Sequence, residues 1–235
     1  MPTSEDTYAT TVKTVKESLQ ARTEESMKAA AMEEKSKDEV EECKAMFDGT
    51  WRKRGYSSLQ GAVTAISART GKCLDYETLN KVCHGCSSWR RKPDSPEKEK
   101  WLAEHSCAIN YHGSAPAMEP EGIRRMFLRS EEKNHLQYTG YIGDGGSKSF
   151  SSISNLEPYQ GKTIKKFECV GHIQKRMGTG LRKVKSQYSG KRLEDGKTIG
   201  GYGRLTGERI DRLQTYYGLA IRRHKNDLEG MRKEA

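Results

Sequence analysis

The sequence predicts an α/β fold whose mixed sheet forms in the order βββαβαβ. Two observations support this prediction. After Cys43 the chain contains short segments of apolar and β-branched residues that are separated by turn-forming residues. Further along, segments with apolar residues three or four positions apart alternate with shorter strand-like ones. With 235 residues the chain is long enough for one large domain that contains an insertion.

The first three strands are expected to be antiparallel neighbours. They are the segments AMFDGTW (45–51), GAVTAISA (61–68) and GKCLDYETL (71–79). The turn-forming stretches KRGYSS and RTG separate them, and such short connections favour antiparallel pairing.

Helices and strands alternate in the second half of the predicted core. A helix is expected over 118–134, because Ile123, Met126 and Phe127 fall on one helical face. A fourth strand follows from Leu136 and ends at Asp144. The segment SKSFSSISNL predicts a helix that a serine caps, and KTIKKFECVG predicts a fifth strand.

The charge of the chain divides it into regions. Residues 1–43 form an acidic lead with a net charge of −5 and a thin apolar stripe at helical spacing, so this helix either packs lightly or serves as an interaction arm. The predicted core covers 44–80 and 113–187, an insertion covers 81–112, and a basic helical region covers 188–235. Residues 169–235 carry a net charge of +9.

Composition narrows the class of protein. The formal charge of +10 and the pI of about 9.2 favour a polyanionic partner. Nucleic acid is the first candidate for that partner. No stretch is apolar enough to cross a membrane, and the N-terminus lacks the apolar core of a secretory signal. An intracellular protein is expected, in which the six cysteines are thiols or metal ligands rather than disulfides.

The insertion contains a candidate zinc site. Cys83 and Cys86 have the C-x-x-C spacing of a zinc knuckle, and His105 with Cys107 would complete a Cys₃His site. His112 could replace His105 as the fourth ligand, and His84 is a weaker candidate. The alternative interpretation is a loop with unpaired surface thiols, but so polar an insertion has little apolar material to fold around without a metal.

Two aspartates stand out in the predicted core. The order βββαβαβ is that of the ribonuclease-H-like fold, in which the first and fourth strands are neighbours, so Asp48 and Asp144 should lie side by side. A shared divalent cation would offset their repulsion and would suit phosphodiester chemistry with two metal ions. The glycines around them would let backbone approach the metal or the phosphate; they are Gly49, Gly143, Gly145 and Gly146. The alternative is that both are ordinary turn aspartates, because Asp-Gly is a common turn dipeptide.

Four segments together resemble the Mutator-like transposase domain of animal genomes, especially those of arthropods. They are FDGTWRKRGYSSLQGAV, IGDGGSKSF, ECVGHIQKRMGTGLRK and DGKTIGGYGRLTGERIDRLQTYYGLAIRR, and the resemblance extends across nearly the whole chain. It implies a DDE/D transposase that cuts and joins DNA with Mg²⁺ or Mn²⁺, with Asp48 as the first catalytic acid and Asp144 as the second. Transposon ends and target DNA are the implied partners, with further copies of the chain assembled on that DNA.

The resemblance also concerns a motif and a set of basic residues. Cys169 and His172 match a C-x-x-H signature that related transposases carry after their second aspartate; a buried thiol and a helix-capping or phosphate-binding histidine are the alternatives. Phosphate contacts are expected from basic residues near these motifs. They are Arg52, Lys53, Arg54, Lys175, Arg176, Arg182, Lys183 and Lys185, followed by Arg222, Arg223 and Lys225.

The sequence departs from the family pattern at two points. Gly146 stands where family members usually have an acidic residue. The family's third acid is a glutamate in a later helix, within a segment resembling T-Q-N-x-N-E, and no such segment occurs before Ala235. We therefore expect a chain truncated before the third acid. Glu194, Glu208 and Glu229 are weak substitutes, because the family does not use those segments for metal binding.

Three functional hypotheses follow from the sequence. The first is a Mutator-like transposase domain that cleaves DNA and transfers strands. The second is a catalytically silent, transposon-derived protein that binds DNA through the zinc module and the basic helices. The third is a ribonuclease-H-like nuclease that acts on RNA or hybrids. A nuclear location is inferred from the DNA substrate.

Overall fold

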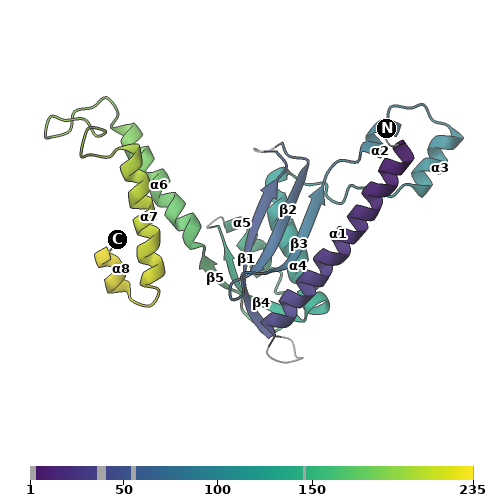
Figure 1. The fold of residues 1–235 in the computed structure, drawn as a ribbon, viewed down its shortest axis with the longest axis horizontal. Coiled ribbons are helices and arrows are strands. Elements are labelled where there is room, and N and C mark those ends of the chain that lie inside the picture. Colours follow the sequence, from purple (N-terminus) through teal and green to yellow (C-terminus); the bar gives the residue numbers. More distant parts are fainter. Residues whose placement is uncertain (1–3, 36–40, 54–56, 145–146, 235) are drawn as a thin grey trace. The chain divides into compact units, whose positions relative to one another are not determined.

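The computed structural model describes residues 4–35, 41–53, 57–144 and 147–234. The chain forms two compact units, Met1–Phe167 and Glu168–Ala235. The first unit contains an open sheet with helices, and the second is helical (Figure 1). The predicted boundaries of the lead, core, insertion and basic region stay predictions.

The sheet has five strands in the order β3-β2-β1-β4-β5. They are β1 (Glu41–Trp51), β2 (Gln60–Ser67), β3 (Cys73–Asn80), β4 (Leu136–Gly143) and β5 (Lys165–Glu168). β1 pairs antiparallel with β2, which pairs antiparallel with β3, whereas β1 pairs parallel with β4. The α/β class, the mixed sheet and the neighbouring first and fourth strands are therefore as the sequence predicts.

Nine helical segments accompany the sheet in the part of the chain that the structure describes. In the first unit these are α1 (Glu5–Glu34), α2 (His84–Trp89), α3 (Pro96–Glu104), the 3₁₀ turn η1 (Ala115–Ala117), α4 (Met118–Asn134) and α5 (Ser147–Ser154). In the second unit they are α6 (Val170–Gln187), α7 (Gly207–Arg223) and α8 (Leu228–Glu234).

Two element boundaries differ from the sequence predictions. Glu41 to Cys43 belong to β1 and not to the helical lead, because their backbone pairs with β4 from Leu136 onward. The last basic segment, expected as one helix, forms α7 and α8 because the backbone leaves the helix around His224, where that residue caps α7. No helix among the described residues is both long and apolar enough to cross a bilayer.

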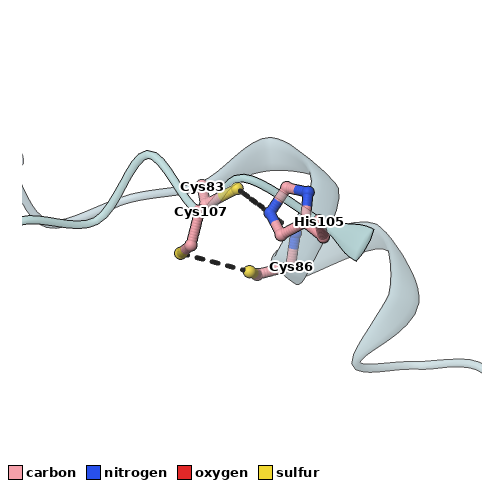
Figure 2. A group of neighbouring side chains, drawn as sticks. All are labelled: Cys83, Cys86, His105 and Cys107. Atoms are coloured by element: carbon pink, nitrogen blue, oxygen red, sulfur yellow. Dashed lines mark hydrogen bonds between the residues drawn. The ribbon is translucent and has the colours of Figure 1, made fainter. Parts of the chain in front are cut away.

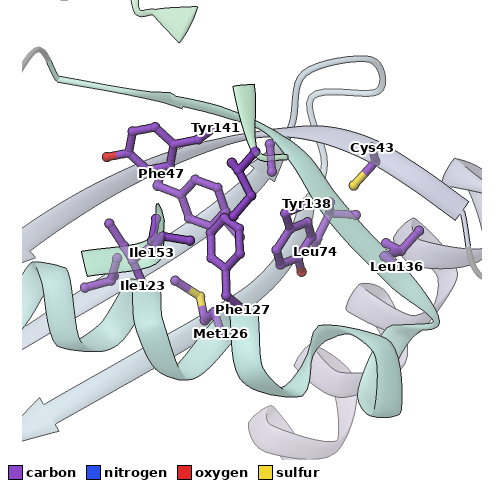
Figure 3. Close-up of a cluster of buried hydrophobic side chains, with 14 of the residues drawn as sticks. Cys43, Phe47, Leu74, Ile123, Met126, Phe127, Leu136, Tyr138, Tyr141 and Ile153 are labelled. Carbon is purple, nitrogen blue, oxygen red and sulfur yellow. The ribbon is translucent and has the colours of Figure 1, made fainter. Parts of the chain in front are cut away.

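The core lies between the sheet and α4. Ile123, Met126 and Phe127 occupy the buried face of this helix, as their spacing predicts (Figure 3). On the sheet side, the Phe47 ring packs against those of Phe127 and Tyr141, with centroid distances of 5.2 and 5.4 Å. Such aromatic contacts stabilise a core beyond the area they bury.

A glycine sets how closely α4 approaches the sheet. A Cβ atom at Gly122 would lie 2.7 Å from Cγ2 of Val63 and 3.0 Å from Cδ1 of Leu79, both of which are buried. Any larger side chain would push the helix away from the strands, since packed interiors have little free volume.

The N-terminal helix is only partly packed. Ser4 caps α1 by accepting a hydrogen bond from the Thr7 amide. Near the other end of the helix Met27, Ala30 and Ala31 are buried, whereas the apolar residues of the first half are exposed; these are Tyr8, Val12, Val15 and Leu19. The second half of α1 therefore packs lightly on the rest of the unit, as one of the two sequence interpretations predicts, whereas its first half is exposed.

Candidate functional site

The parallel pairing of β1 with β4 brings two acidic positions together. The pairing places Ala45 opposite Tyr141 and Met46 opposite Ile142. Continued by two residues, this register pairs Asp48 with Asp144, which directly follows β4. Both side chains are exposed. Two adjacent parallel strands therefore bring the two predicted acids to neighbouring positions.

Asp48 lies inside β1 and not at its end. β1 continues for three residues, and Gly49 to Trp51 still pair with β2. The burial of Phe47 and the exposure of Asp48 follow the alternation of side chains along a strand. Asp48 therefore belongs to the sheet face opposite the one that α4 covers.

A third carboxylate, which the sequence analysis missed, lies on the α4 side of this strand end. Glu119 is in the first turn of α4, and its Oε1 accepts a hydrogen bond of 3.2 Å from the Ser149 hydroxyl. Its position next to the sheet depends on the crossover that delivers α4, so no local sequence signal could reveal it.

The three carboxylates influence one buried phenol. Burial raises the pKa of Tyr141 to about 12, the negative charge of Glu119 adds to this effect, and Asp144 and Asp48 contribute further. The ends of β1 and β4 thus form a region of concentrated negative charge, which attracts cations.

Two glycines in this region are required by close packing. A Cβ atom at Gly49 would lie 3.0 Å from Oε2 of Glu119, and one at Gly143 would lie 2.3 Å from the Tyr141 hydroxyl. The absence of a side chain at these two glycines leaves room for the side chains of Glu119 and Tyr141. Gly145 and Gly146, also expected to matter, lie outside the described residues.

The donor chemistry of the aspartate pair fits a hard divalent cation. Mg²⁺ prefers oxygen ligands and commonly uses one or two protein carboxylates together with water and substrate phosphates. Asp48 and Asp144 are exposed and would supply two such carboxylates.

The second candidate centre is the Cys/His cluster of the insertion. The ligand atoms of Cys83, Cys86, His105 and Cys107 all lie within 4.8 Å of one another (Figure 2). The Cys83 sulfur lies 3.1 Å from Nε2 of His105, and the Cys86 and Cys107 sulfurs are 3.5 Å apart. Three thiolates and one imidazole are a standard donor set for tetrahedral zinc, so this cluster can hold a zinc ion. Within the described chain it is the one such group of three or more residues.

The structure decides between the alternative ligands. His105, at the end of α3, joins the cluster. Its alternative His112 and the weaker candidate His84 are exposed and lie outside it. The clustering of these ligands favours the metal-site interpretation over that of unpaired surface thiols in a loop.

Hydrogen bonds within the cluster favour the thiolate form of Cys83. The backbone amide of Cys86, and next that of Ala108, donate to its sulfur and lower its pKa to about 6. The thiol of Cys86 has a raised pKa of about 11, chiefly because of its hydrogen bond with Cys107. One sulfur is thus already prepared for metal binding, because the thiolate is the form that ligates.

Aromatic rings support the cluster. Trp101 stacks on His105 with a centroid distance of 4.0 Å, and on Trp89 with 5.3 Å. Gly85 fits against this stack, because a Cβ atom there would lie 2.8 Å from Trp101. α2 and α3 contain no buried residue, so the module has no apolar core beyond these rings.

Hydrogen bonds attach the module to the sheet. The side chain of Asn110 accepts from the Asn80 amide and donates to the Thr78 carbonyl, at 2.7 and 2.8 Å. The side chain of Asn80 donates to the Ala108 carbonyl, and Arg125 of α4 donates to the Asn110 carbonyl. The two ends of the insertion are thereby held together at the end of β3.

The C-x-x-H residues lie at the junction between β5 and α6. Cys169 directly follows β5 and caps α6, and His172 is in the first turn of that helix. Their position at the end of the fifth strand is as expected, while their proximity to the acidic pair stays a prediction.

The basic residues predicted to contact DNA differ in their surroundings. Arg52 and Lys53 are exposed just beyond β1, and Arg52 donates to Gln60, while Arg54 lies outside the described residues. On α6, Arg176 pairs with Glu168 and Arg182 pairs with Asp211. Among the described residues no carboxylate forms an ion pair with the lysines of this helix, which are Lys175, Lys183 and Lys185.

These features define an α/β protein with an acidic pair on adjacent parallel strands and a Cys₃His insertion. The model of the Mutator-like transposase family matches residues 1–235, and the chain belongs to that family. No curated protein and no solved structure matches it.

Replacing one ligand tests the zinc cluster. We expect Cys86→Ser to lose most of its bound zinc and to increase amide exchange across 81–112, because zinc contributes on the order of 10 kcal/mol to the folding of such modules. The measurements are zinc content by mass spectrometry after dialysis and hydrogen exchange of the same sample. Cys73→Ser removes a thiol outside the cluster and should keep both properties. Equal zinc content in the two variants would show that the cluster does not hold the metal.

Proposed function

We propose that this chain is the catalytic domain of a DNA transposase, in which Asp48 and Asp144 bind Mg²⁺ or Mn²⁺ for DNA cleavage and strand transfer. The family match makes the function transposase-like. The single observation that supports the catalytic proposal is the parallel register of β1 with β4. Continued by two residues, this register sets Asp48 of β1 opposite Asp144, which directly follows β4. The third acid, a glutamate that the resemblance places in a later segment, is not among residues 1–235, so the proposed catalytic site is incomplete in these residues.

Each part of the chain has a role in this proposal. Asp48 and Asp144 hold the cations, which when bound activate the attacking oxygen and stabilise the leaving oxygen of a phosphodiester. The lysines of α6 and the exposed Arg52 and Lys53 bind DNA phosphates, which fixes the position of the duplex. The Cys₃His cluster holds zinc and orders the insertion. Action on DNA gives the protein a nuclear location.

Removing either aspartate tests the catalytic proposal. Because residues 1–235 lack the third acid, we expect only slow nicking of supercoiled plasmid in the presence of Mn²⁺. Asp48→Ala or Asp144→Ala should abolish it, because stabilisation of transition-state charge by metals amounts to several kcal/mol. The measurement is the rate of conversion of supercoiled into open-circular DNA.

A matched variant separates catalysis from nonspecific effects. Asp6→Ala removes an exposed carboxylate from α1 and should nick at the parent rate. Unchanged nicking by Asp48→Ala would contradict the catalytic proposal. If the parent binds DNA but does not nick it, the chain is better described as a catalytically silent DNA-binding protein.

The salt dependence of DNA binding tests the phosphate contacts. Each lysine that neutralises a phosphate adds about 0.9 to the slope of log K against log salt. A variant with Gln at positions 175, 183 and 185 should therefore reduce the slope by about 2 to 3. Fluorescence anisotropy with a short duplex of arbitrary sequence measures it. Lys28→Gln, an exposed lysine of the acidic helix, is the control and should leave the slope unchanged.

A further inference from the structure

The connector between α6 and α7 ends in a tight turn with an aromatic residue at its tip. The amide of Arg204 donates to the Gly201 carbonyl at 3.0 Å, which places Tyr202 and Gly203 at the two central positions of a four-residue turn. Gly203 has a φ of 75°, the value that the third position of a type II turn requires. Tyr202 therefore occupies the second position, from which a side chain points outward.

The ring of Tyr202 is fully exposed. Its relative exposure of 105% is the highest among the exposed large apolar residues of the described chain, and the next, Met32, has 70%. Tyr202 is also the one aromatic residue of 189–206, and glycines flank it at positions 200, 201 and 203. A large aromatic ring in water, with no apolar neighbour to pack on, gains nothing for the fold.

Hydrogen bonds hold this turn in place. The Arg204 guanidinium donates to the Thr198 carbonyl at 3.0 Å and forms an ion pair with Asp195. Arg209, in the first turn of α7, donates to the Gly203 carbonyl, and the Leu205 amide donates to the Ile199 carbonyl. The exposure of Tyr202 is thus a property of an ordered turn, and the backbone entropy of placing this residue at the tip is lost on folding rather than on binding.

The surroundings of the ring are basic. Lys191, Arg192 and Lys197 of the same connector are exposed, and among the described residues no carboxylate forms an ion pair with them. The acidic residues of the connector are Asp195, which is paired with Arg204, and the exposed Glu194, so basic residues outnumber acidic ones here. A polyanion that approaches these cations would come close to the tip of the turn.

We propose that Tyr202 stacks on an unpaired DNA base while the basic residues of the connector contact the adjoining phosphates. This inference rests on the proposed function in DNA cleavage and joining, which exposes bases at strand breaks. Stacking on an aromatic ring is how proteins hold single-stranded segments without reading their sequence, and neighbouring cations track the backbone.

The chemistry of the tip favours a base over a protein partner. Stable protein interfaces bury about 800 Å² on each partner and have an apolar centre made of several residues. Here a single ring lies among glycines and charged residues, and this ring is the one flat apolar surface at the tip of the turn. A nucleobase has a matching planar shape and carries its own phosphate.

Three variants and two DNA probes test the proposal. The probes are a duplex with a short single-stranded gap that contains 2-aminopurine, and the same duplex without the gap. We expect Tyr202→Ala to bind the gapped duplex about tenfold more weakly, because a stacked base contributes 1 to 3 kcal/mol. The variant should also fail to quench the 2-aminopurine fluorescence that the parent quenches. Tyr202→Phe keeps the ring and should behave like the parent, as should Tyr216→Ala, which removes an exposed tyrosine of α7.

The possible results separate this inference from the proposed function. If Tyr202→Ala binds and quenches like the parent while the lysine variant weakens binding, the stacking inference is wrong and DNA binding stands. If Tyr202→Phe is as weak as Tyr202→Ala, the hydroxyl and not the ring makes the contact, which also overturns stacking. If the parent binds neither probe, both proposals fail. Circular dichroism of Tyr202→Ala should match the parent, since the ring supports no part of the fold.

Discussion

The parallel pairing of β1 with β4 is the constraint on which the rest of the first unit depends. β1, β2 and β3 are joined by short turns, but a strand parallel to β1 can be reached only through a long crossover. Residues 81–135 form that crossover, and its last part, α4, covers one face of the sheet. Continued past its last pair, the register that results sets Asp48, which lies within β1, opposite Asp144, which follows β4. A different register would bury the acids or separate them.

The crossover carries an insertion without disturbing the strands because its two ends are held together. The hydrogen bonds between Asn80 and the segment around Asn110 close the insertion at the end of β3, so the chain enters and leaves at nearly the same place. Beyond this point the Cys₃His cluster and the stacked rings of Trp89, Trp101 and His105 supply the internal contacts. The module has little apolar core beyond these rings, which is the situation in which a bound metal would contribute most to folding.

Local pattern was enough to predict the strands, α4 and the clustering of the cysteines, because alternation, helical spacing and C-x-x-C spacing are all properties of short segments. Features set by the three-dimensional structure were not predictable from sequence. The first residues of β1 look helical in sequence but pair with β4, and Arg176 and Arg182, expected to face DNA, form ion pairs within their own unit. Glu119 and the turn of Tyr202 were missed because packing and a positive φ, rather than a motif, give them their positions.

Localised cleavage of the chain by bound iron tests most directly whether the two strands share a metal site. Fe²⁺ would replace Mg²⁺ in the zinc-loaded protein, ascorbate and peroxide would generate radicals at the metal, and mass spectrometry would map the cuts. A shared metal site predicts cuts near both Asp48 and Asp144, which excess Mg²⁺ and the variant Asp48→Asn suppress together. Cuts near only one of them, or cuts elsewhere that Asp48→Asn does not change, would contradict a shared site on β1 and β4.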